Sequence, residues 1–441
     1  MSFSKKCLPI LLSACLLALP ACGNAEPSAP ESSVPESSAP AESSASQEAS
    51  QAESGAAAAV PSFTFTGEEL LPGGKPAMDE GAQPAVFYYD EEFSLQATYP
   101  EARCRDLSGV DFSASPDKLL YTTFDSKTVW PDNLPEGFDP QQILDRNRNP
   151  GLGVRSLHEQ GITGKGVNIG IVDDKLLTDH IEYKDRLKMY KNFGTSEYAM
   201  EASMHGLAVA SIALGSTVGV APEANPYYAA YDFQKALGEN GESLAPFIEG
   251  LTYLLDVNEL LPEEDKLDVI SISKGWTAGI EEGVEEIDAL VERAAEEGIL
   301  VVTCAIESME EQCGFSLNGA SRDPLSNPDD RSVYCVGRYS STLNGLAAPM
   351  DFRGFASPTG PEDYVSYADG GISWTAPYVA GVYALAKQVK PEITPEEFCR
   401  LAMETSSSIR HETQQIGGKP TVSILYNLID PPALIAALQQ E

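Results

Sequence analysis

Basic residues are scarce in this chain of 441 residues. There are 29 Lys and Arg against 66 Asp and Glu, which gives a formal net charge of -37 at pH 7. Such an acidic chain repels phosphate backbones and anionic headgroups, so nucleic acid is not expected as a partner. Beyond the N-terminus, no apolar run approaches the roughly 20 residues that cross a bilayer. The body of the chain is therefore predicted not to span a membrane.

Histidine and cysteine are also few, with 4 His and 8 Cys. No Cys-x-x-Cys or His-Cys grouping predicts a metal site. Three Cys lie within the first 22 residues, and an odd number remains, which cannot all pair within one chain. Two interpretations stay open: one or two disulfides formed in an oxidising exterior, or buried thiols that act as small apolar residues. The remaining cysteines are Cys104, Cys304, Cys313, Cys335 and Cys399.

The N-terminus is typical of an export signal, predicted over residues 1–21. Lys5 and Lys6 precede an apolar stretch from Leu8 to Leu19, and small residues follow. Removal of this segment takes away the two Lys, so the mature formal charge becomes -37 - 2 = -39.

The end of this signal, Leu19-Pro20-Ala21-Cys22, resembles the lipobox of bacterial lipoproteins, in which the Cys is lipidated and becomes the mature N-terminus. Cys15 also fits the pattern but would leave too short an apolar core. The resemblance therefore implies lipidation at Cys22 and a location at the cell membrane, facing outside the cytoplasm. The alternative is an ordinary cleaved secretory signal.

Composition divides the rest of the chain into three parts. Residues 22–59 are almost all Ser, Ala, Pro and Glu without apolar periodicity, which predicts a disordered tether. Residues 60–148 hold short strand-like runs broken by Pro and Gly. A propeptide, an accessory domain and an extended arm all fit this segment. Residues 149–441 are predicted to form the main domain.

This main domain alternates apolar strands with amphipathic helices. Helical periodicity over Glu281–Glu297 ends at Gly298, an expected left-handed cap, and Thr394 to Glu397 has the pattern of a capping box. The alternation predicts an α/β fold with a mostly parallel sheet, helices on both faces and any site at the carboxyl ends of the strands. The predicted strands are Val167–Val172, Tyr227–Tyr231, Leu267–Ile272, Ile299–Ala305 and Ser332–Val336.

Three residues are candidates for catalysis. Asp173 directly follows the first predicted strand, and His205 opens a predicted helix together with Gly206. Ser373 follows a glycine turn at the start of a long apolar helix, where free N–H groups favour a developing oxyanion. Each also has an ordinary explanation, because an acidic loop cap, a structural His and a Ser N-cap are common.

Taken together, in the order Asp, His, Ser, these segments resemble the subtilisin family of serine peptidases over about Asn149–Thr405. The resemblance implies a subtilisin-like fold in which Ser373 is the nucleophile, His205 the general base and Asp173 the residue that orients the imidazole. The matching segments are Gly164–Asp173, His205-Gly206, Gly219–Pro222 and Gly371–Gly381.

The same resemblance implies an exported endopeptidase that acts on peptides or proteins. The segment from Ser271 through Ser273 and Gly275 to Trp276 is similar to the edge that pairs with a substrate backbone, with Gly275 allowing close approach and Trp276 walling a pocket. No cofactor is implied. Structural calcium is compatible with the family, but no acidic loop spacing predicts a site.

Several residues depart from the family pattern. Trp374 follows the serine where the family usually has Met, and Asp174 follows Asp173 where a small residue is usual. Glu307 stands where an Asn amide normally donates to the oxyanion, and an ionised carboxylate has no proton to donate.

Three interpretations of Glu307 remain open. Burial raises its pKa so that it donates as an acid, which would give a weakly acidic optimum. Alternatively, its side chain points elsewhere, or the domain is a catalytically weak peptide-binding module.

Overall fold

The computed structural model describes residues 63–89, 91–194, 201–231, 243–340, 342–414 and 420–440. The predicted signal peptide, Cys22 and the predicted tether lie outside these residues. In the described ranges, no helix has the length and apolar character needed to cross a membrane.

A parallel sheet of five strands in the order β3-β4-β2-β5-β6 forms the centre of the fold. β2 pairs with β4 on one side and with β5 on the other, so that Val172 lies opposite both Ala229 and Ile272. All six residues of β2 are buried, as expected for a strand covered on both faces. The strands are β2 (Asn168–Asp173), β3 (Met189–Asn192), β4 (Asn225–Ala230), β5 (Val269–Ile272) and β6 (Leu300–Thr303).

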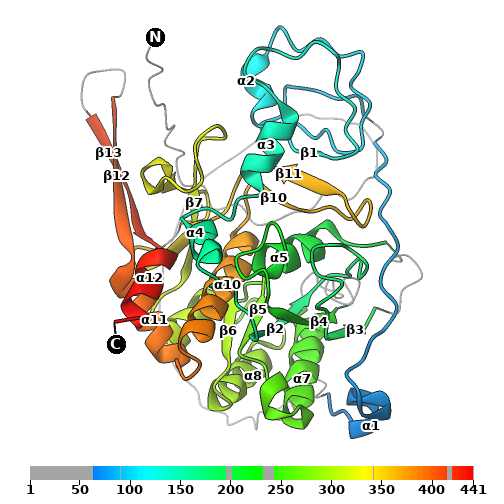
Figure 1. The fold of residues 1–441 in the computed structure, drawn as a ribbon, viewed down its shortest axis with the longest axis vertical. Coiled ribbons are helices and arrows are strands. Elements are labelled where there is room, and N and C mark those ends of the chain that lie inside the picture. Colours follow the sequence, from blue (N-terminus) through cyan, green and yellow to red (C-terminus); the bar gives the residue numbers. More distant parts are fainter. Residues whose placement is uncertain are drawn as a thin grey trace, which may run out of the picture. The chain divides into compact units, whose positions relative to one another are not determined.

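Helices cover both faces of this sheet (Figure 1). Because successive strand residues point to opposite faces, Ile171 joins the apolar cluster that includes α5 and α10, whereas Val172 joins the cluster that includes α7 and α8. The predicted α/β class with a mostly parallel sheet is confirmed. The covering helices are α5 (Met204–Leu214), α7 (Ala245–Leu260), α8 (Val284–Glu296) and α10 (Thr375–Val389).

Four of the five predicted strands are present, with ends that differ by up to two residues. The fifth, Ser332–Val336, is mostly wrong. Its first half is a short 3-10 helix, Arg331–Val333, because the side chain of Asp330 accepts a hydrogen bond from the Ser332 amide and caps a turn. Only Cys335–Val336 is extended, as β8. The prediction was based on the local pattern of apolar residues, which does not indicate this capping interaction.

The predicted helix at Glu281 begins later, at Val284, because Gly283 adopts a left-handed conformation with φ 95°. Gly298, with φ 77°, follows its end as predicted. At α11 (Pro395–Thr405), Thr394 caps the Glu397 amide, but the Glu397 side chain pairs with Lys390, 2.7 Å away.

Two further sheets flank the central one. A mixed sheet has the order β12-β13-β9-β7-β8, and an antiparallel sheet has the order β1-β11-β10. The β10–β11 hairpin leads into the 3-10 helix η4 (Ile372–Trp374) and then α10. Their strands are β1 (Phe124–Asp125), β7 (Leu317–Ser321), β9 (Leu346–Pro349), β10 (Arg353–Ala356), β11 (Tyr364–Tyr367), β12 (Ser407–Gln414) and β13 (Pro420–Leu428).

Residues 63–148, here called the arm, share their packing with the main domain. Backbone hydrogen bonds join Asp79 and Ala77 to Tyr190 of the edge strand β3. Farther along, β1 pairs with β11, and the apolar cluster around Phe124 includes Val218 and Tyr364 of the main domain. The arm therefore has no core separate from that domain within the described residues.

The remaining helices are short. They are distributed along the chain from the arm to the C-terminal end. They are α1 (Gly67–Leu70), η1 (Pro72–Gly74), α2 (Pro116–Leu119), α3 (Pro140–Asn147), α4 (Val154–Glu159), η2 (Glu263–Asp265), α9 (Ile306–Cys313), η3 (Arg331–Val333) and α12 (Pro431–Leu438).

The cysteines resolve into one disulfide and three thiols. Cys313 at the end of α9 is bonded to Cys399 in α11. Cys104, Cys304 and Cys335 are not in disulfides. The interpretation of one disulfide is thus confirmed, whereas the three remaining thiols are only partly buried.

Candidate active site

Asp173 is the last residue of β2, at the carboxyl edge of the central sheet. Its side chain is only 2% exposed, and one carboxylate oxygen accepts a 2.8 Å hydrogen bond from the Asp174 amide. Because β2 lies between β4 and β5, this carboxylate projects from the middle of the edge where open α/β sheets place their ligands.

His205 occupies the first turn of α5, whose N-cap is Ser203. Its Nδ1 lies 2.7 Å from Oδ1 of Asp173. Gly206 permits this approach, since a Cβ there would come within 2.4 Å of the Asp174 carbonyl oxygen. The structure thus brings the predicted Asp and His into direct contact across 32 residues of sequence.

The charges around His205 change its protonation. Burial of the imidazole lowers its pKa, but the charge of Asp173 and its hydrogen bond, followed by the charge of Asp174, outweigh that effect, so the pKa is raised above its ordinary value. The imidazolium form is therefore stabilised, as required of a base that receives a proton during a reaction.

Asp174 is a second carboxylate at the same place. Burial first, and then the charge of Asp173, raises its pKa, while the charge of His205 and the hydrogen bond from Ser203 oppose the rise. The Ser203 hydroxyl donates to Asp174 over 2.8 Å. The sequence flagged Asp174 only as a crowding departure, and the structure shows it to be part of the charge environment of His205.

Asp173, Asp174 and His205 also resemble a metal-binding group, because their ligand atoms lie within 4.8 Å of one another. Their atoms are already used, however. Nδ1 of His205 is bonded to Asp173, and Asp174 accepts from Ser203. The arrangement is better explained as a hydrogen-bonded acid–base pair than as a metal site.

Ser373 lies in η4, at the start of α10. Its Oγ donates a long hydrogen bond of 3.4 Å to the carbonyl oxygen of Ser273, and Ser273 Oγ donates to the Ser373 carbonyl over 2.8 Å. Ser273 follows β5, the neighbour of β2, so this pairing holds Ser373 at the edge that carries Asp173.

Among the hydrogen bonds of the described residues, none joins Ser373 to His205. Catalytic hydrogen bonds are often loose without substrate and tighten in the complex. The Ser373 hydroxyl is instead bonded to Ser273 in this state.

Trp374, next to Ser373, is a further residue of the site. Its ring centroid lies 5.2 Å from that of His205, with the planes inclined by 39°. The indole is 3% exposed, and its Nε1 has no hydrogen-bond partner. The substitution at this position was evident from the sequence, but its contact with the imidazole was not.

Two side chains of the predicted substrate edge are buried, and the pairing of this edge with a substrate stays a prediction. Ser271 is 1% exposed within β5, an interior strand of the sheet, so its side chain is not available to a substrate in this state. Trp276 is 4% exposed and its indole donates to Asp288 over 2.8 Å, so it packs in the core rather than walling an open pocket. Burial of the apolar ring stabilises the fold, and the indole N–H is satisfied by a residue of α8.

Gly275 does permit close approach, but to this chain's own backbone. A Cβ at Gly275 would lie 3.1 Å from the Cys304 carbonyl oxygen, and the Cys304 amide donates to the Lys274 carbonyl over 3.1 Å. The two segments that follow β5 and β6 are thus held together close enough to Asp173 for its charge to act on Cys304. The Cys304 thiol is kept protonated, because burial first and the charge of Asp173 second raise its pKa to about 12.

Glu307 is exposed in the first turn of α9. Its exposure removes the basis for the interpretation that burial keeps it protonated. A carboxylate at the first turn of a helix is favoured by the helix dipole, which gives Glu307 an ordinary structural role as well.

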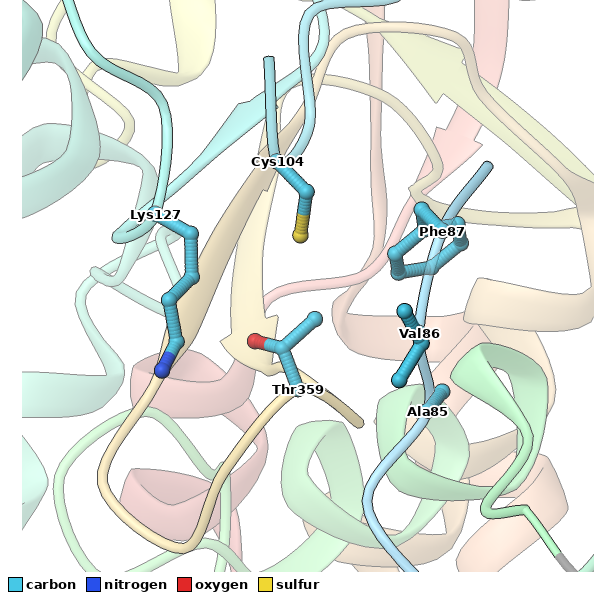
Figure 2. A pocket seen from close by; sticks show the side chains of 6 residues that line it. All are labelled: Ala85, Val86, Phe87, Cys104, Lys127 and Thr359. Carbon is cyan, nitrogen blue, oxygen red and sulfur yellow. The ribbon is translucent and has the colours of Figure 1, made fainter. Parts of the chain in front are cut away.

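A pocket of about 380 Å³ lies between the arm and the loop after β10. Figure 2 shows Ala85, Val86 and Phe87 on one side, Lys127 on the other, and Cys104 and Thr359 between them. Burial first, and then the hydrogen bond with Asp125, raises the pKa of Cys104 to about 12, so this thiol is a weak nucleophile. None of the lining residues is one of the predicted site residues.

Comparisons with known proteins find similarity to serine proteases. The chain is 24% identical over 387 residues to the subtilisin-like protease PopC of Myxococcus xanthus, covering 79% of each chain. It is 28% identical over 284 residues to the major intracellular serine protease of Bacillus subtilis, covering 57% of this chain and 79% of that one. A protease structure from Pseudoalteromonas arctica aligns with a TM-score of 0.47 and 20% identity over 68% of this chain and 98% of that one.

The family match itself spans residues 164–349. This span contains Asp173 and His205, and Ser373 follows it. Over these residues the chain is therefore similar to the subtilase family of peptidases, and the relatives named above are serine proteases.

Proposed function

We propose that this protein is an exported serine endopeptidase that hydrolyses peptide bonds through Ser373, His205 and Asp173. The observation that carries the proposal is the 2.7 Å pair of His205 and Asp173 at the sheet edge to which Ser273 holds Ser373. A Ser side chain alone is a weak nucleophile, and this pair provides the base that activates it.

The contacts define a role for each side chain. The hydrogen bond from Nδ1 to the Asp173 carboxylate places the proton on that nitrogen, which leaves Nε2 as the basic atom. Nε2 takes the proton of Ser373 as Oγ attacks the substrate carbonyl carbon. The imidazolium then protonates the departing amine, and water releases the acyl group by the same steps. Asp173 and Asp174 stabilise the transient positive charge.

A serine-directed fluorophosphonate tests the proposal. The wild-type protein should be labelled on one residue, and Ser373→Ala should abolish labelling. His205→Ala, which retains the nucleophile, should slow labelling strongly because the hydroxyl loses its base. Labelling that persists in Ser373→Ala would disprove the triad.

A binding module is the second candidate, and two observations favour it. Ser373 is bonded to Ser273 rather than to His205, and a carboxylate, Glu307, stands where the resemblance implies an amide donor. A binding module differs from a peptidase in a peptide-binding assay. Its peptides should bind the wild-type protein and Ser373→Ala equally and be recovered uncut from both.

The arm is proposed to be a permanent part of the protein rather than an excised propeptide. Its β1 strand pairs with β11, and Nδ2 of Asn147 donates to Ser366 over 2.9 Å in a buried contact. Removal would expose Val218 and Tyr364, which pack against the apolar side chains of the arm. The wild-type protein and Ser373→Ala should therefore have the same size after export, and a shorter wild-type form would contradict this.

Lipidation of Cys22, and with it a membrane location facing outside the cytoplasm, completes the proposal. Support comes only from the sequence around Cys22. Metabolic labelling with a radioactive fatty acid should mark the wild-type protein and not Cys22→Ser, and the variant should appear in the medium. A labelled Cys22→Ser would assign the anchor to another residue.

A further inference from the structure

The arm approaches the catalytic histidine through a continuous stack of side chains. Arg103 of the arm lies over the ring of Phe87, 4.7 Å from the centroid, and over Tyr367 of β11 at 5.7 Å. Tyr367 meets Trp374 edge to face, with centroids 5.9 Å apart, and Trp374 lies 5.2 Å from His205. These contacts connect a residue of the arm to the imidazole.

Arg103 is fixed firmly enough to support the stack. Its Nε and Nη2 donate to the two carboxylate oxygens of Glu101 over 2.9 and 2.7 Å, and its side chain is only 11% exposed. A bidentate Arg–carboxylate pair has a defined geometry, unlike a single contact of a flexible side chain. The guanidinium plane is therefore held in one orientation between two rings.

The imidazole needs such support. Its bond to Asp173 fixes Nδ1, but a single hydrogen bond leaves the ring able to rock about that point. Trp374 packs against the ring in a tilted arrangement and so opposes this motion. Phe355 and Tyr367 in turn pack against Trp374, with centroid distances of 5.3 and 5.9 Å. A π face also stabilises the imidazolium that forms when the base receives a proton.

We propose that Arg103 is a positioning residue for His205, acting through Tyr367 and Trp374, so that the arm is required for a correctly held catalytic base. This inference rests on the proposed function in that it concerns the same histidine. It goes beyond that function by assigning the arm a role in the site. It also explains why Trp rather than a smaller side chain follows Ser373.

Arg103→Met is the central variant, because it keeps the length of the side chain and removes the charged plane. Arg105→Ala is the matched control. Arg105 lies on the same arm over the ring of Tyr89, at 3.6 Å, and no described contact joins it to Trp374. Arg103→Met loses the cation–π contacts with Phe87 and Tyr367, whereas Arg105→Ala loses the contact with Tyr89, which is not part of the stack.

The first readout does not depend on turnover. NMR titration of His205, together with its Nδ1 proton resonance, reports the pKa and the mobility of the imidazole. The charged groups that act on this pKa are Asp173 and Asp174. Arg103→Met should lower the His205 pKa by up to about one unit and broaden the Nδ1 proton signal, since the stabilising face becomes mobile. Arg105→Ala should leave both unchanged. Arg103→Lys should fall between Arg103→Met and the wild type.

The second readout is kinetic. Arg103→Met should lower kcat about 2- to 30-fold, the range of one cation–π contact, with little change in KM. If the wild-type protein has no turnover, the proposed function fails, and the titration still decides this inference.

Two results would overturn the positioning role: a His205 titration in Arg103→Met identical to the wild type, or an equal shift in Arg105→Ala. If Arg103→Met does not fold, Phe87→Leu replaces it, since it removes only the outer ring of the stack. A smaller shift in the same direction is then expected, and no shift would count against the proposal.

Discussion

Replacing Glu307 tests whether this chain is limited by its oxyanion position. A carboxylate there differs from an amide in two ways: it lacks a proton to donate, and it adds a negative charge. In a subtilisin, loss of one such donor lowers kcat by about 10²–10³, or about 2.7–4 kcal/mol. The effect of the charge depends on its surroundings, because two unit charges 4 Å apart interact by about 1 kcal/mol in water and about 4 kcal/mol at an effective dielectric constant of 20.

The exposure of Glu307 decides between these magnitudes. A carboxylate in the solvent-exposed first turn of α9 is close to the aqueous limit, so the missing donor is the larger defect. Glu307→Asn should therefore raise kcat/KM near neutral pH by up to about 10²-fold. Glu307→Ala removes the charge alone and should give about fivefold. Glu307→Gln should fall between them if its longer side chain overshoots the oxygen.

The assay is kcat/KM on a fluorogenic peptide across pH, together with the melting temperature of each variant. Loss of the carboxylate from the first turn of α9 should cost about 0.3–1 kcal/mol of stability, which separates folding from catalysis. Because the pKa of His205 is raised, activity should increase with pH through that pKa, without the weakly acidic optimum that a buried, protonated Glu307 would give. If Glu307→Asn is no faster than Glu307→Ala, Glu307 does not face the oxyanion.

Three further outcomes are expected. Burial raises the pKa of Asp351 to about 7, so ionisation of its carboxyl lowers the stability of the fold as pH rises from about 4 to about 7. Asp351→Asn should therefore raise the melting temperature at pH 8 and not at pH 4, with an upper bound of about 4 kcal/mol on the gain in stability. Equal gains at both pH values would refute the assignment. The disulfide between Cys313 and Cys399 closes a loop of 86 residues in sequence separation. Cys399→Ser should therefore lose about 2–5 kcal/mol of unfolding free energy, and its stability should no longer depend on reductant. Denaturation curves with and without reductant measure both effects. Asp173→Asn should keep its melting temperature within a few degrees and lower kcat by about 10⁴, and a smaller loss would mean that another group orients His205.

Features that depend on neighbouring residues in the sequence could be predicted, whereas those that depend on contacts between distant residues could not. The β2 strand and its terminal Asp173 were predictable because a continuous apolar run followed by a carboxylate is a local pattern. The α8 helix was predictable for the same reason, apart from its start, which depends on the conformation of Gly283.

The sequence by itself therefore determined the α/β class, the order of the strands along the chain and the three residues proposed as the triad. Local periodicity carries the class and the strand order, whereas the triad follows from the resemblance of the segments around Asp173, His205 and Ser373 to the subtilisin family.

The tertiary structure decided which side chains meet. It paired Cys313 with Cys399, left Glu307 in solvent and buried Trp276 against Asp288. It also placed Arg103 on the stack that ends at His205. Each of these depends on the direction of a side chain and on partners far away in the sequence, which only the packing of the strands and helices against one another fixes.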